Sequence, residues 1–338
     1  MDATDGPGRL LEISGSYWQG CALQAAAMLD VFTPLCREPL DAAELTARLG
    51  CDARALAMLL DALAAMGLLT REAGRCVPTP CARAFLDRES PRCVAHVLRH
   101  HHRIMGSWAR LPEAVRTGRP LGEHMTDHGD PGAREDFLLA MDGIATAIAP
   151  GLAATVDLAG RRRFLDVGGG PGTYASHFCL ANPELTATVF DLPGSREYAR
   201  AKAARLGVAD RVDFHAGDYL RDPMPAGYDV AWLSQILHAE DPAGCRTVIA
   251  KAVASVVPGG LVFVHEFMLD DARDGPLFAT LFSLNMLLGT PRGQAYAEGE
   301  IREMLEEAGV REVKRLDFTG PNGSRILCGR VPAEAAAG

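Results

Sequence analysis

The chain has 338 residues, of which 48% are hydrophobic and 23% are charged. This is ordinary globular composition, and the length favours two domains over a single core. There are 34 Lys and Arg residues against 43 Asp and Glu, which gives a formal net charge of -9. Such a surface repels polyphosphate, and the short basic run Arg161–Arg163 leads directly into an apolar strand. We therefore expect no nucleic-acid partner.

Nine cysteines are spread along the chain without a CxxC pair, which argues against a zinc ribbon or a thioredoxin-type redox motif. The first residues lack the basic and apolar segments of a secretion signal. We also expect no apolar stretch long enough to span a bilayer. These features favour reduced thiols in a cytoplasmic protein that has no membrane partner.

The first part of the chain has the periodicity of helices. Apolar residues recur at helical spacing between residues 10 and 31. Asp41 and Glu44 have the spacing of a capping box, which predicts that a helix begins there. A second helix is expected over residues 52–66, and a small hairpin over residues 68–77. Helix, turn, helix and hairpin in this order are typical of a winged helix.

A winged helix either reads DNA or serves as a packing module. A transcription factor of this kind places its second helix in the major groove. That helix carries one Arg and two Asp over residues 52–63, whereas a groove-reading helix needs several cations and amide side chains. We therefore predict that residues 10–95 form a winged-helix dimerisation domain. A transcriptional regulator remains the remote alternative.

A further helix is expected over residues 96–111, in a helical connector that we place at residues 96–150. His96 and His100 are four residues apart and can share a helix face, which is a spacing suited to a metal pair. No third ligand follows at metal spacing, so the sequence predicts no metal site. Trp108 in the same helix is interpreted as a packing or pocket-lining residue.

Residues 164–167 begin the most informative segment of the chain. They form a short apolar strand, the glycine-rich turn 168–172 follows at once, and residues 173–181 are expected to be helical. Strand, glycine-rich turn and helix is the arrangement in which bare backbone approaches a ligand closely. The segment therefore predicts a nucleotide-type binding site.

Two classes of cofactor use such a turn. Dinucleotide folds have the pattern G-x-G-x-x-A, which Gly170 to Ala175 satisfy. Adenosylmethionine enzymes have an acidic residue just before a G-x-G-x-G run. That second pattern is matched here by Asp166, Gly168, Gly170 and Gly172.

The next two strand ends separate these alternatives. Asp191 ends the second strand, where a carboxylate is expected to bind both ribose hydroxyls, and Leu192 beside it is a further candidate for cofactor contact. Asp218 and Tyr219 follow the third strand, where the carboxylate can accept from the adenine amino group while the ring packs on the base. A nicotinamide enzyme needs no acid at that point. The predicted cofactor is S-adenosyl-L-methionine, with S-adenosyl-L-homocysteine as its product.

Two more strands are expected at residues 228–233 and 261–265, the latter after a Pro-Gly-Gly turn, and a terminal hairpin at residues 312–330. Helices between the strands imply right-handed crossovers and a ligand at the carboxyl ends of a parallel sheet. The expected fold class is therefore α/β. A Rossmann-like, doubly wound and mostly parallel sheet with an antiparallel terminal hairpin occupies residues 151–331, preceded by the mainly helical domain.

At this point the chain resembles the class I S-adenosylmethionine-dependent O-methyltransferase family of bacteria and plants, typified by caffeate and flavonoid methyltransferases. The resemblance covers nearly the whole chain, and it implies a winged-helix dimerisation domain, a homodimer and a small-molecule acceptor. It rests on five motifs in order, at residues 165–172, 190–193, 217–219, 235–238 and 258–260.

The resemblance also implies roles for single residues. His238 falls on the general base of the family, and Glu266 falls on an acid that orients that histidine. Met141 matches a methionine that touches the acceptor or the donor. Ser234 replaces a lysine that plant members place against the adenosyl group, and a second glutamate of the family maps near Ala295, where this chain has none.

The chemistry of His238 supports the same role independently. A phenol is a poor nucleophile at neutral pH, and imidazole titrates in the range needed to remove its proton. Glu266 can hold one ring nitrogen so that the other faces the acceptor. The alternative is a structural histidine at a helix start, capped by Glu240 and Asp241.

Apolar residues recur at helical spacing over residues 276–289, either as core or as the wall of an acceptor site. We predict an O-methyltransferase that acts on a hydroxyl of a small aromatic or polyketide-like metabolite. Methylation of carbon or nitrogen, or a relative that has lost transfer, is the alternative on the same fold. The candidate acceptor-site residues are Trp108, Met141, Phe282 and Met286.

Overall fold

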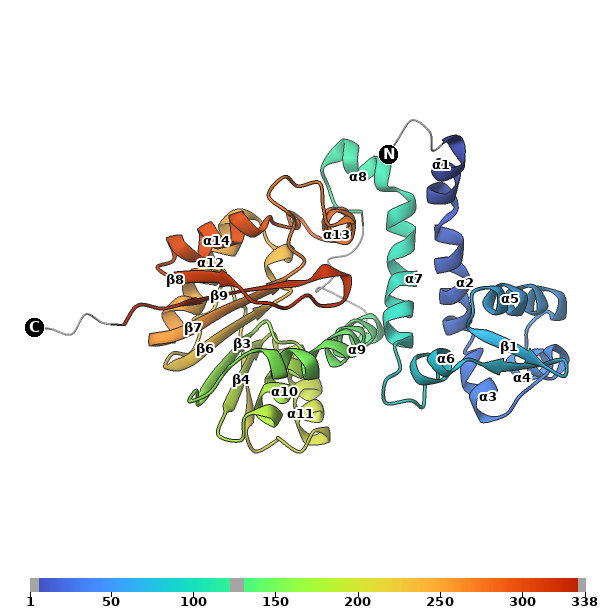
Figure 1. The fold of residues 1–338 in the computed structure, drawn as a ribbon, viewed down its shortest axis with the longest axis horizontal. Coiled ribbons are helices and arrows are strands. Elements are labelled where there is room, and N and C mark those ends of the chain that lie inside the picture. The colour runs from blue at the N-terminus through green and yellow to red at the C-terminus, as the bar shows by residue number, and fades with distance from the viewer. Residues whose placement is uncertain (1–5, 122–130, 334–338) are drawn as a thin grey trace, which may run out of the picture. The chain divides into compact units, whose positions relative to one another are not determined.

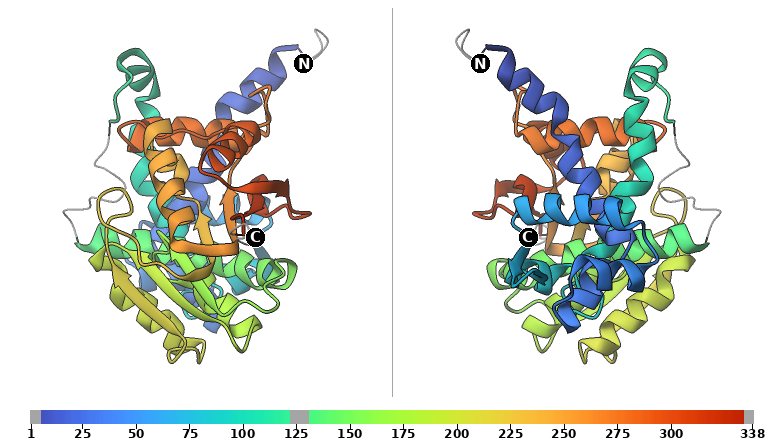
Figure 2. Two further views of the ribbon diagram at one scale, coloured as in Figure 1. Left: turned by 90° about the vertical axis from the view of Figure 1, so that its left-hand side faces the viewer. Right: turned by 90° about the vertical axis from the view of Figure 1, so that its right-hand side faces the viewer.

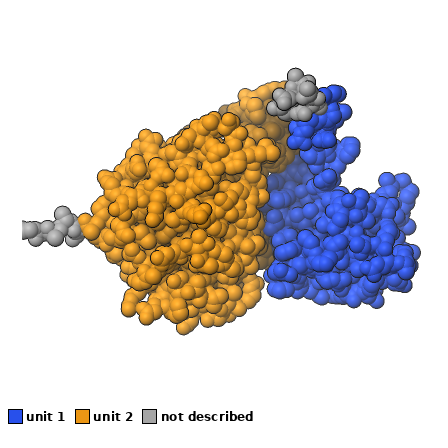
Figure 3. Space-filling model, in the orientation of Figure 1, with its two compact units in different colours: residues 1–106 blue, residues 107–338 orange. Residues whose placement is uncertain are grey.

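The computed structural model describes residues 6–121 and 131–333 and has an α/β fold. The chain divides into two compact units, residues 1–106 and residues 107–338 (Figure 3). Their boundary falls inside the segment that the sequence assigns to a helical connector.

The first unit is helical and contains one small hairpin. Asp41 accepts the backbone N–H of Glu44 while Glu44 accepts the N–H of Asp41, so the predicted capping box is confirmed. The two short strands pair antiparallel. The elements are α1 Gly6–Gly15, α2 Tyr17–Met28, α3 Phe32–Arg37, α4 Ala42–Leu49, α5 Ala53–Ala65, β1 Leu69–Glu72, β2 Arg75–Pro78, α6 Pro80–Phe85 and α7 Ala95–Ala109, the last of which runs across the boundary.

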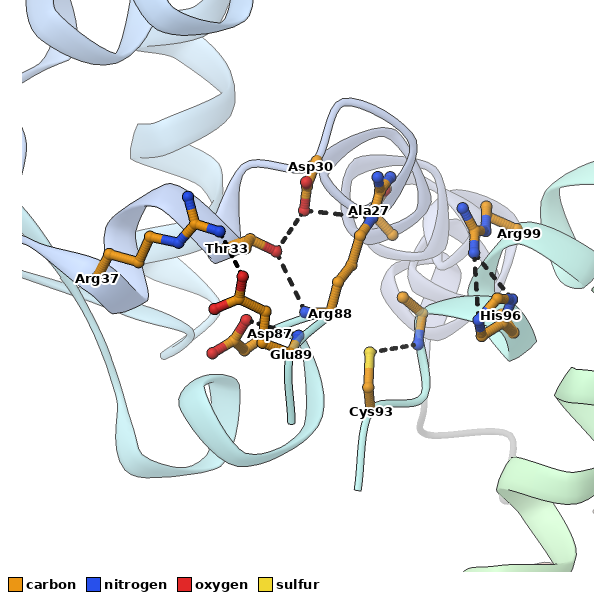
Figure 4. A network of polar contacts seen from close by, with 11 residues as sticks. Ala27, Asp30, Thr33, Arg37, Asp87, Arg88, Glu89, Cys93, His96 and Arg99 are labelled. Carbon is orange, nitrogen blue, oxygen red and sulfur yellow. Dashed lines mark hydrogen bonds and ion pairs between the residues drawn. The ribbon is translucent and has the colours of Figure 1, made fainter. Parts of the chain in front are cut away.

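A polar network joins the α2–α3 turn to the segment after α6 (Figure 4). The guanidinium of Arg88 donates to the carbonyl of Ala27 at 3.2 Å and lies 3.3 Å from the carboxylate of Asp30. Thr33 accepts the backbone N–H of Arg88 and donates its hydroxyl to Asp30. The cations of this unit therefore stabilise its own turns, and the apolar core of the helices and hairpin lies beside them.

The second unit is built on a seven-stranded sheet with the order β5-β4-β3-β6-β7-β9-β8 (Figure 1). Strands β3 to β7 run parallel, and β9 is antiparallel to both of its neighbours. The mostly parallel sheet and the terminal hairpin are thus as predicted, although β7 begins earlier and includes the Pro-Gly-Gly segment. The strands are β3 Arg163–Val167, β4 Thr186–Asp191, β5 Val212–Ala216, β6 Tyr228–Ser234, β7 Val256–Glu266, β8 Arg311–Arg315 and β9 Arg325–Arg330.

Helices cover both faces of this sheet (Figure 2). One face packs against α9, α10 and α11 around the fully buried Trp232, and the other packs against α12 and α14. This double layer leaves the carboxyl ends of the parallel strands for the site. The helices are α8 Leu111–Thr117, α9 Pro131–Thr155, α10 Thr173–Ala181, α11 Arg196–Arg205, α12 Pro242–Ser255, α13 Leu277–Gly289 and α14 Glu298–Glu307.

Helix α9 corrects one expectation from the sequence. Its segment Arg134–Thr155 is long and apolar enough, by length and composition, to cross a membrane. In this structure the helix packs on α10, and Ile148 and Leu152 enter the core beside the sheet. Asp142 in the same segment pairs with the buried ammonium of Lys202 on α11 at 2.6 Å. One face of α9 is therefore held in the unit by apolar packing and this ion pair, while 33% of its most apolar window is buried.

Candidate active site

The glycine-rich turn follows β3 and has the backbone that its sequence requires. Gly168, Gly170 and Gly172 have φ values of 65°, 51° and 65°, in the left-handed region that favours glycine. A Cβ atom at Gly168 would lie 2.7 Å from the side chain of Ile236. Among the residues that the structure describes, the one neighbour within 4 Å of such an atom at Gly170 is Leu138, at 4.0 Å, so this part of the turn offers bare backbone to a ligand.

Asp166 lies beneath the turn. It is 1% exposed, and its Oδ2 accepts the backbone N–H of Ala175 at 3.2 Å. A Cβ atom at Gly169 would lie 2.5 Å from the Asp166 carboxyl carbon. The position of the Asp166 carboxyl group therefore requires a glycine at residue 169. Burial raises the pKa of Asp166 to about 7, although the bond from Ala175 opposes this shift. The geometry therefore places Asp166 as a support of the turn.

Asp191 ends β4 and holds the same turn from the side. Its carboxylate accepts the N–H of Gly170 at 2.7 Å, the N–H of Leu192 at 2.6 Å and the hydroxyl of Ser195 at 2.9 Å. Burial raises the pKa of Asp191, while these three bonds oppose the shift. Leu192 is 44% exposed beside it, so an apolar surface adjoins the carboxylate.

Asp218 and Tyr219 lie on the loop after β5. The carboxylate of Asp218 accepts the N–H of Leu220 at 2.8 Å. The hydroxyl of Tyr219 donates to Glu240 at 2.8 Å, and burial together with the Glu240 charge raises the pKa of Tyr219 well above its ordinary value. Lys251 on α12 donates to three carbonyls of this loop, at 2.8 to 3.0 Å.

These groups come together because β3, β4 and β5 are adjacent and parallel. Val167 pairs with Phe190, and Asp191 pairs with Ala216, so the three strand ends lie side by side. Bare glycine backbone and two carboxylates that can accept hydroxyl and amino protons fit an adenosyl group. Within the described part of the chain, no side chain comes closer than 4.0 Å to a Cβ atom placed at Gly170. The donor set predicted from the sequence is therefore assembled in one place.

Ser234 ends β6 and contacts a buried histidine that sequence reasoning missed. Its hydroxyl lies 2.9 Å from Nδ1 of His265, and Nε2 of His265 lies 3.0 Å from the hydroxyl of Ser324. Burial lowers the pKa of His265 to about 4, so the ring is neutral at physiological pH. Neither His265 nor Lys251 belongs to a local motif, and their partners lie far away in the sequence.

His238 and Glu266 meet at the carboxyl ends of β6 and β7. Nδ1 of His238 lies 2.9 Å from Oε2 of Glu266, whose carboxylate also accepts the N–H groups of Leu237 and Phe267. Burial alone would raise the pKa of Glu266. The charge and hydrogen bond of His238 outweigh burial, and the pKa falls below its ordinary value.

The alternative of a capped histidine does not match this geometry. Asp241 accepts the N–H of Gly244 at the start of α12, and Glu240 accepts from Tyr219. The side chain of His238 instead faces Glu266 on a different strand.

An apolar surface adjoins His238. The Phe282 ring stands edge-on to the imidazole, with the ring centroids 4.8 Å apart and the planes at 88°. Phe267 and Phe278 contact Phe282 and extend this surface. Ala295 is buried in the same cluster, where its N–H donates to Ser283.

The other predicted acceptor residues occupy different surroundings. Trp108 donates from its indole N–H to Asn285 on α13 at 3.0 Å. Met141 is half-buried on α9. Met286 has no exposed surface, in contrast to the half-buried Phe282.

The histidines of α7 form no metal cluster with their neighbours. Within residues 6–121 and 131–333, no group of three or more His, Cys, Asp or Glu side chains is placed to hold a metal ion. Nδ1 of His96 lies 2.8 Å from the guanidinium of Arg99, and burial lowers the pKa of His101.

Comparison with known proteins extends over both units. Residues 108–311 match the O-methyltransferase domain family, and residues 11–88 match the O-methyltransferase dimerisation domain. The tetracenomycin polyketide synthesis 8-O-methyl transferase TcmO of Streptomyces glaucescens is 36% identical over 333 residues, covering 97% of each chain. The 3-hydroxy-5-methyl-1-naphthoate 3-O-methyltransferase of Streptomyces sahachiroi is 34% identical over 330 residues, covering 96% of this chain and 95% of the relative.

A third relative is named for methyl transfer to nitrogen rather than to oxygen. The N,N-dimethyltransferase OxyT of Streptomyces rimosus is 32% identical, with 91% of this chain and 92% of the relative covered. Among solved structures, human N-acetylserotonin methyltransferase in complex with SAM has a TM-score of 0.86 at 27% identity and covers 98% of this chain and 100% of its own. The chain therefore belongs to the O-methyltransferase family and is an S-adenosylmethionine-dependent methyltransferase that carries the family's dimerisation domain.

Proposed function

We propose that this enzyme methylates a hydroxyl group of an aromatic or polyketide-like metabolite, with His238 as the general base. The observation that carries the proposal is the 2.9 Å contact between His238 and the buried Glu266 beside the Phe282 ring. The names of the Streptomyces relatives, a polyketide and a naphthoate O-methyltransferase, support this acceptor class. The apolar wall suits a planar ring system.

Glu266 has a defined task in this mechanism. Its ionised carboxylate keeps the Nδ1 proton of His238 in place, so the other ring nitrogen is left to take the acceptor's hydroxyl proton. General base catalysis of this kind contributes roughly a hundred- to ten-thousand-fold. The surrounding phenylalanines limit water, which strengthens the electrostatic interactions of the pair.

S-adenosylmethionine, when bound, supplies an electrophilic methyl group on a sulfonium sulfur. The Gly168–Gly172 backbone is proposed to lie against the donor, with Asp166 supporting the turn from below. Asp191 is proposed to accept from the ribose hydroxyls and Asp218 from the adenine amino group. Further donor contacts are assigned to Leu192, Tyr219 and Ser234.

The acceptor contacts are proposed from the surroundings of His238. Phe282 is assigned a direct contact because it is half-buried and touches the imidazole. Trp108 and Met141 are assigned to the periphery of the acceptor site. Met286 is assigned to the layer behind Phe282, because it is fully buried.

Transfer assays with His238→Ala test this function. Wild type and variant are compared on 1-naphthol, 3-hydroxy-1-naphthoate and related phenols, with His102→Ala as the matched control because His102 is an exposed histidine. We expect turnover to fall at least a hundredfold in His238→Ala and to stay unchanged in the control. Equal turnover in wild type and His238→Ala would remove His238 from the mechanism.

The similarity to OxyT makes nitrogen the second candidate for the methylated atom. Mass spectrometry and NMR of the product distinguish the outcomes, because an O-methyl, an N-methyl and a C-methyl group have different chemical shifts. A product methylated on nitrogen or carbon would contradict the assignment to oxygen. The binding of the donor would be unaffected by that result.

The partner proposed is a second copy of the same chain, bound through the first unit. Large apolar side chains on α1 and α2, including Leu11 and Trp18, are exposed in a single chain. We propose no nucleic-acid or membrane partner, and a cytoplasmic location is supported by nine free cysteines. Retention of duplex DNA at low salt in a gel shift would contradict this proposal.

A further inference from the structure

Glu240 connects three segments of the proposed site that lie apart in the sequence. It follows the one-turn 3-10 helix Leu237–Ala239, which carries His238. Its carboxylate accepts the hydroxyl of Tyr219 at 2.8 Å. Its backbone carbonyl accepts the hydroxyl of Tyr296 at 2.6 Å.

The two tyrosines come from segments that lie far apart in the sequence. Tyr219 lies beside Asp218 on the loop assigned to the adenine end of the donor. Tyr296 is 3% exposed, and its carbonyl accepts the N–H of Leu269 in the segment that follows Glu266. Glu240 is therefore hydrogen-bonded to the donor side by its side chain and to the acceptor side by its backbone.

The turn that carries His238 has little room to move independently of these contacts. A Cβ atom at Gly293 would collide with the His238 carbonyl, so the segment before Tyr296 backs directly on this turn. Glu266 accepts the N–H of Leu237 at 3.0 Å. A displacement of Glu240 therefore changes the backbone from which the imidazole projects.

We propose that Glu240 is a positioning residue that couples occupation of the donor site to the orientation of His238. Bound donor fixes the Tyr219 ring, the Tyr219 hydroxyl fixes the Glu240 carboxylate, and Glu240 fixes the turn that presents the base. The inference rests on the proposed function, because it takes Tyr219 as a donor contact and His238 as the base. A hydrogen bond to a charged acceptor is stronger than a neutral one, which suits this task.

The state of Tyr219 agrees with this chain of contacts. Burial and the neighbouring Glu240 charge raise its pKa well above the ordinary value, so the hydroxyl stays protonated and donates at physiological pH. Replacing Glu240 by glutamine keeps an oxygen that can accept from Tyr219, whereas alanine removes it. The two substitutions therefore separate loss of the contact from loss of the charge.

The test follows the imidazole of His238 by NMR of protein with 13C-labelled histidines. The chain has 10 histidines, and the His238 signal is the one missing from the His238→Ala spectrum. Saturating S-adenosylhomocysteine is expected to shift this signal in wild type. The shift should fall by at least half in Tyr219→Phe and Glu240→Ala, and Glu240→Gln should restore it. Tyr198→Phe is the matched control, because Tyr198 is half-buried on α11, away from these contacts.

Kinetics with 1-naphthol give a second readout. In Tyr219→Phe, kcat at saturating donor and acceptor is expected to fall roughly tenfold, the equivalent of one such hydrogen bond, while the donor KM changes less than about threefold. A full wild-type shift in both Tyr219→Phe and Glu240→Ala would overturn the coupling. So would an unshifted His238 signal in wild type that demonstrably binds S-adenosylhomocysteine. Failure of wild type to bind that ligand would overturn the donor site itself.

Discussion

Replacing Glu266 by glutamine isolates its role, because the substitution keeps the shape and removes the charge. Oε1 of Glu266 accepts the N–H groups of Leu237 and His238 at 3.0 and 3.4 Å. Oε2 accepts the N–H of Phe267 at 3.2 Å and lies 2.9 Å from Nδ1 of His238. Both oxygens face donors, so the amide nitrogen of glutamine must face donors on one side or the other.

Each orientation of that amide has a cost. Facing the turn, it leaves two buried N–H groups unpaired, at about 1–3 kcal/mol each. Facing His238, it donates a hydrogen bond to Nδ1, so Nδ1 must be unprotonated, and the other ring nitrogen carries the hydrogen and cannot act as the base. We expect kcat to fall roughly a hundred- to ten-thousand-fold, which corresponds to about 2.7–5.4 kcal/mol in the barrier.

The assay measures kcat on 1-naphthol and the affinity for S-adenosylhomocysteine by calorimetry in wild type, Glu266→Gln and Glu307→Gln. Glu307 is the matched control because it is a half-exposed carboxylate on α14 that pairs with Arg246. Donor affinity should be retained in both variants. A Glu266→Gln enzyme with kcat within about threefold of wild type would refute the reasoning.

The same pair predicts a dependence of stability on pH. The pKa of Glu266 is lowered below its ordinary value of 4.5 by His238, so the ionised form is favoured in the folded state. Its contribution is complete above about pH 4.5 and is lost as pH falls through the lowered value. The stability difference between wild type and Glu266→Gln should therefore be constant near neutrality and shrink in acid. Urea unfolding at several pH values measures it.

Three further substitutions test other parts of the account. Asp191→Asn should raise the Kd for S-adenosylhomocysteine about 10- to 100-fold in calorimetry, because hydrogen bonds to a charged acceptor are worth about 1.5–3 kcal/mol. An unchanged Kd would count against the ribose contact. Lys202→Met removes the buried ammonium from Asp142, which keeps the more exposed Arg205 as its other partner, and should lower the free energy of unfolding by about 1–3 kcal/mol. An unchanged free energy of unfolding in urea titrations would be contrary to this role. Leu11→Glu with Trp18→Glu should convert the dimer to monomer in native mass spectrometry, and a persisting dimer would move the interface elsewhere.

The strand ends that carry the proposed donor residues could be predicted from the sequence because their signals are local. The glycine turn and Asp191 each follow a strand directly, and parallel pairing brings neighbouring strand ends together without further information. The match of His238 with Glu266 also follows from two strand ends. These predictions depend on chain order and strand pairing alone.

Contacts between side chains far apart in sequence were not predictable in this way. Glu240 was considered as a cap for His238, yet its partner is Tyr219, because the packing of α12 against the sheet brings the β5 loop within reach. The full burial of Met286 depends on which face of α13 is covered by other elements, and helical periodicity does not decide this because most of the helix is apolar. The contact of α9 with α10, on the side where Ile148 and Leu152 enter the core, is likewise not indicated by the local sequence.

The proposed function depends most on the binding of an adenosyl group between the glycine turn and the carboxylates of Asp191 and Asp218. Isothermal calorimetry of S-adenosylhomocysteine and S-adenosylmethionine with the purified wild-type protein, at two temperatures, measures this directly. Saturable heat with one site per chain is the predicted result. The absence of heat for both ligands at both temperatures would contradict the account.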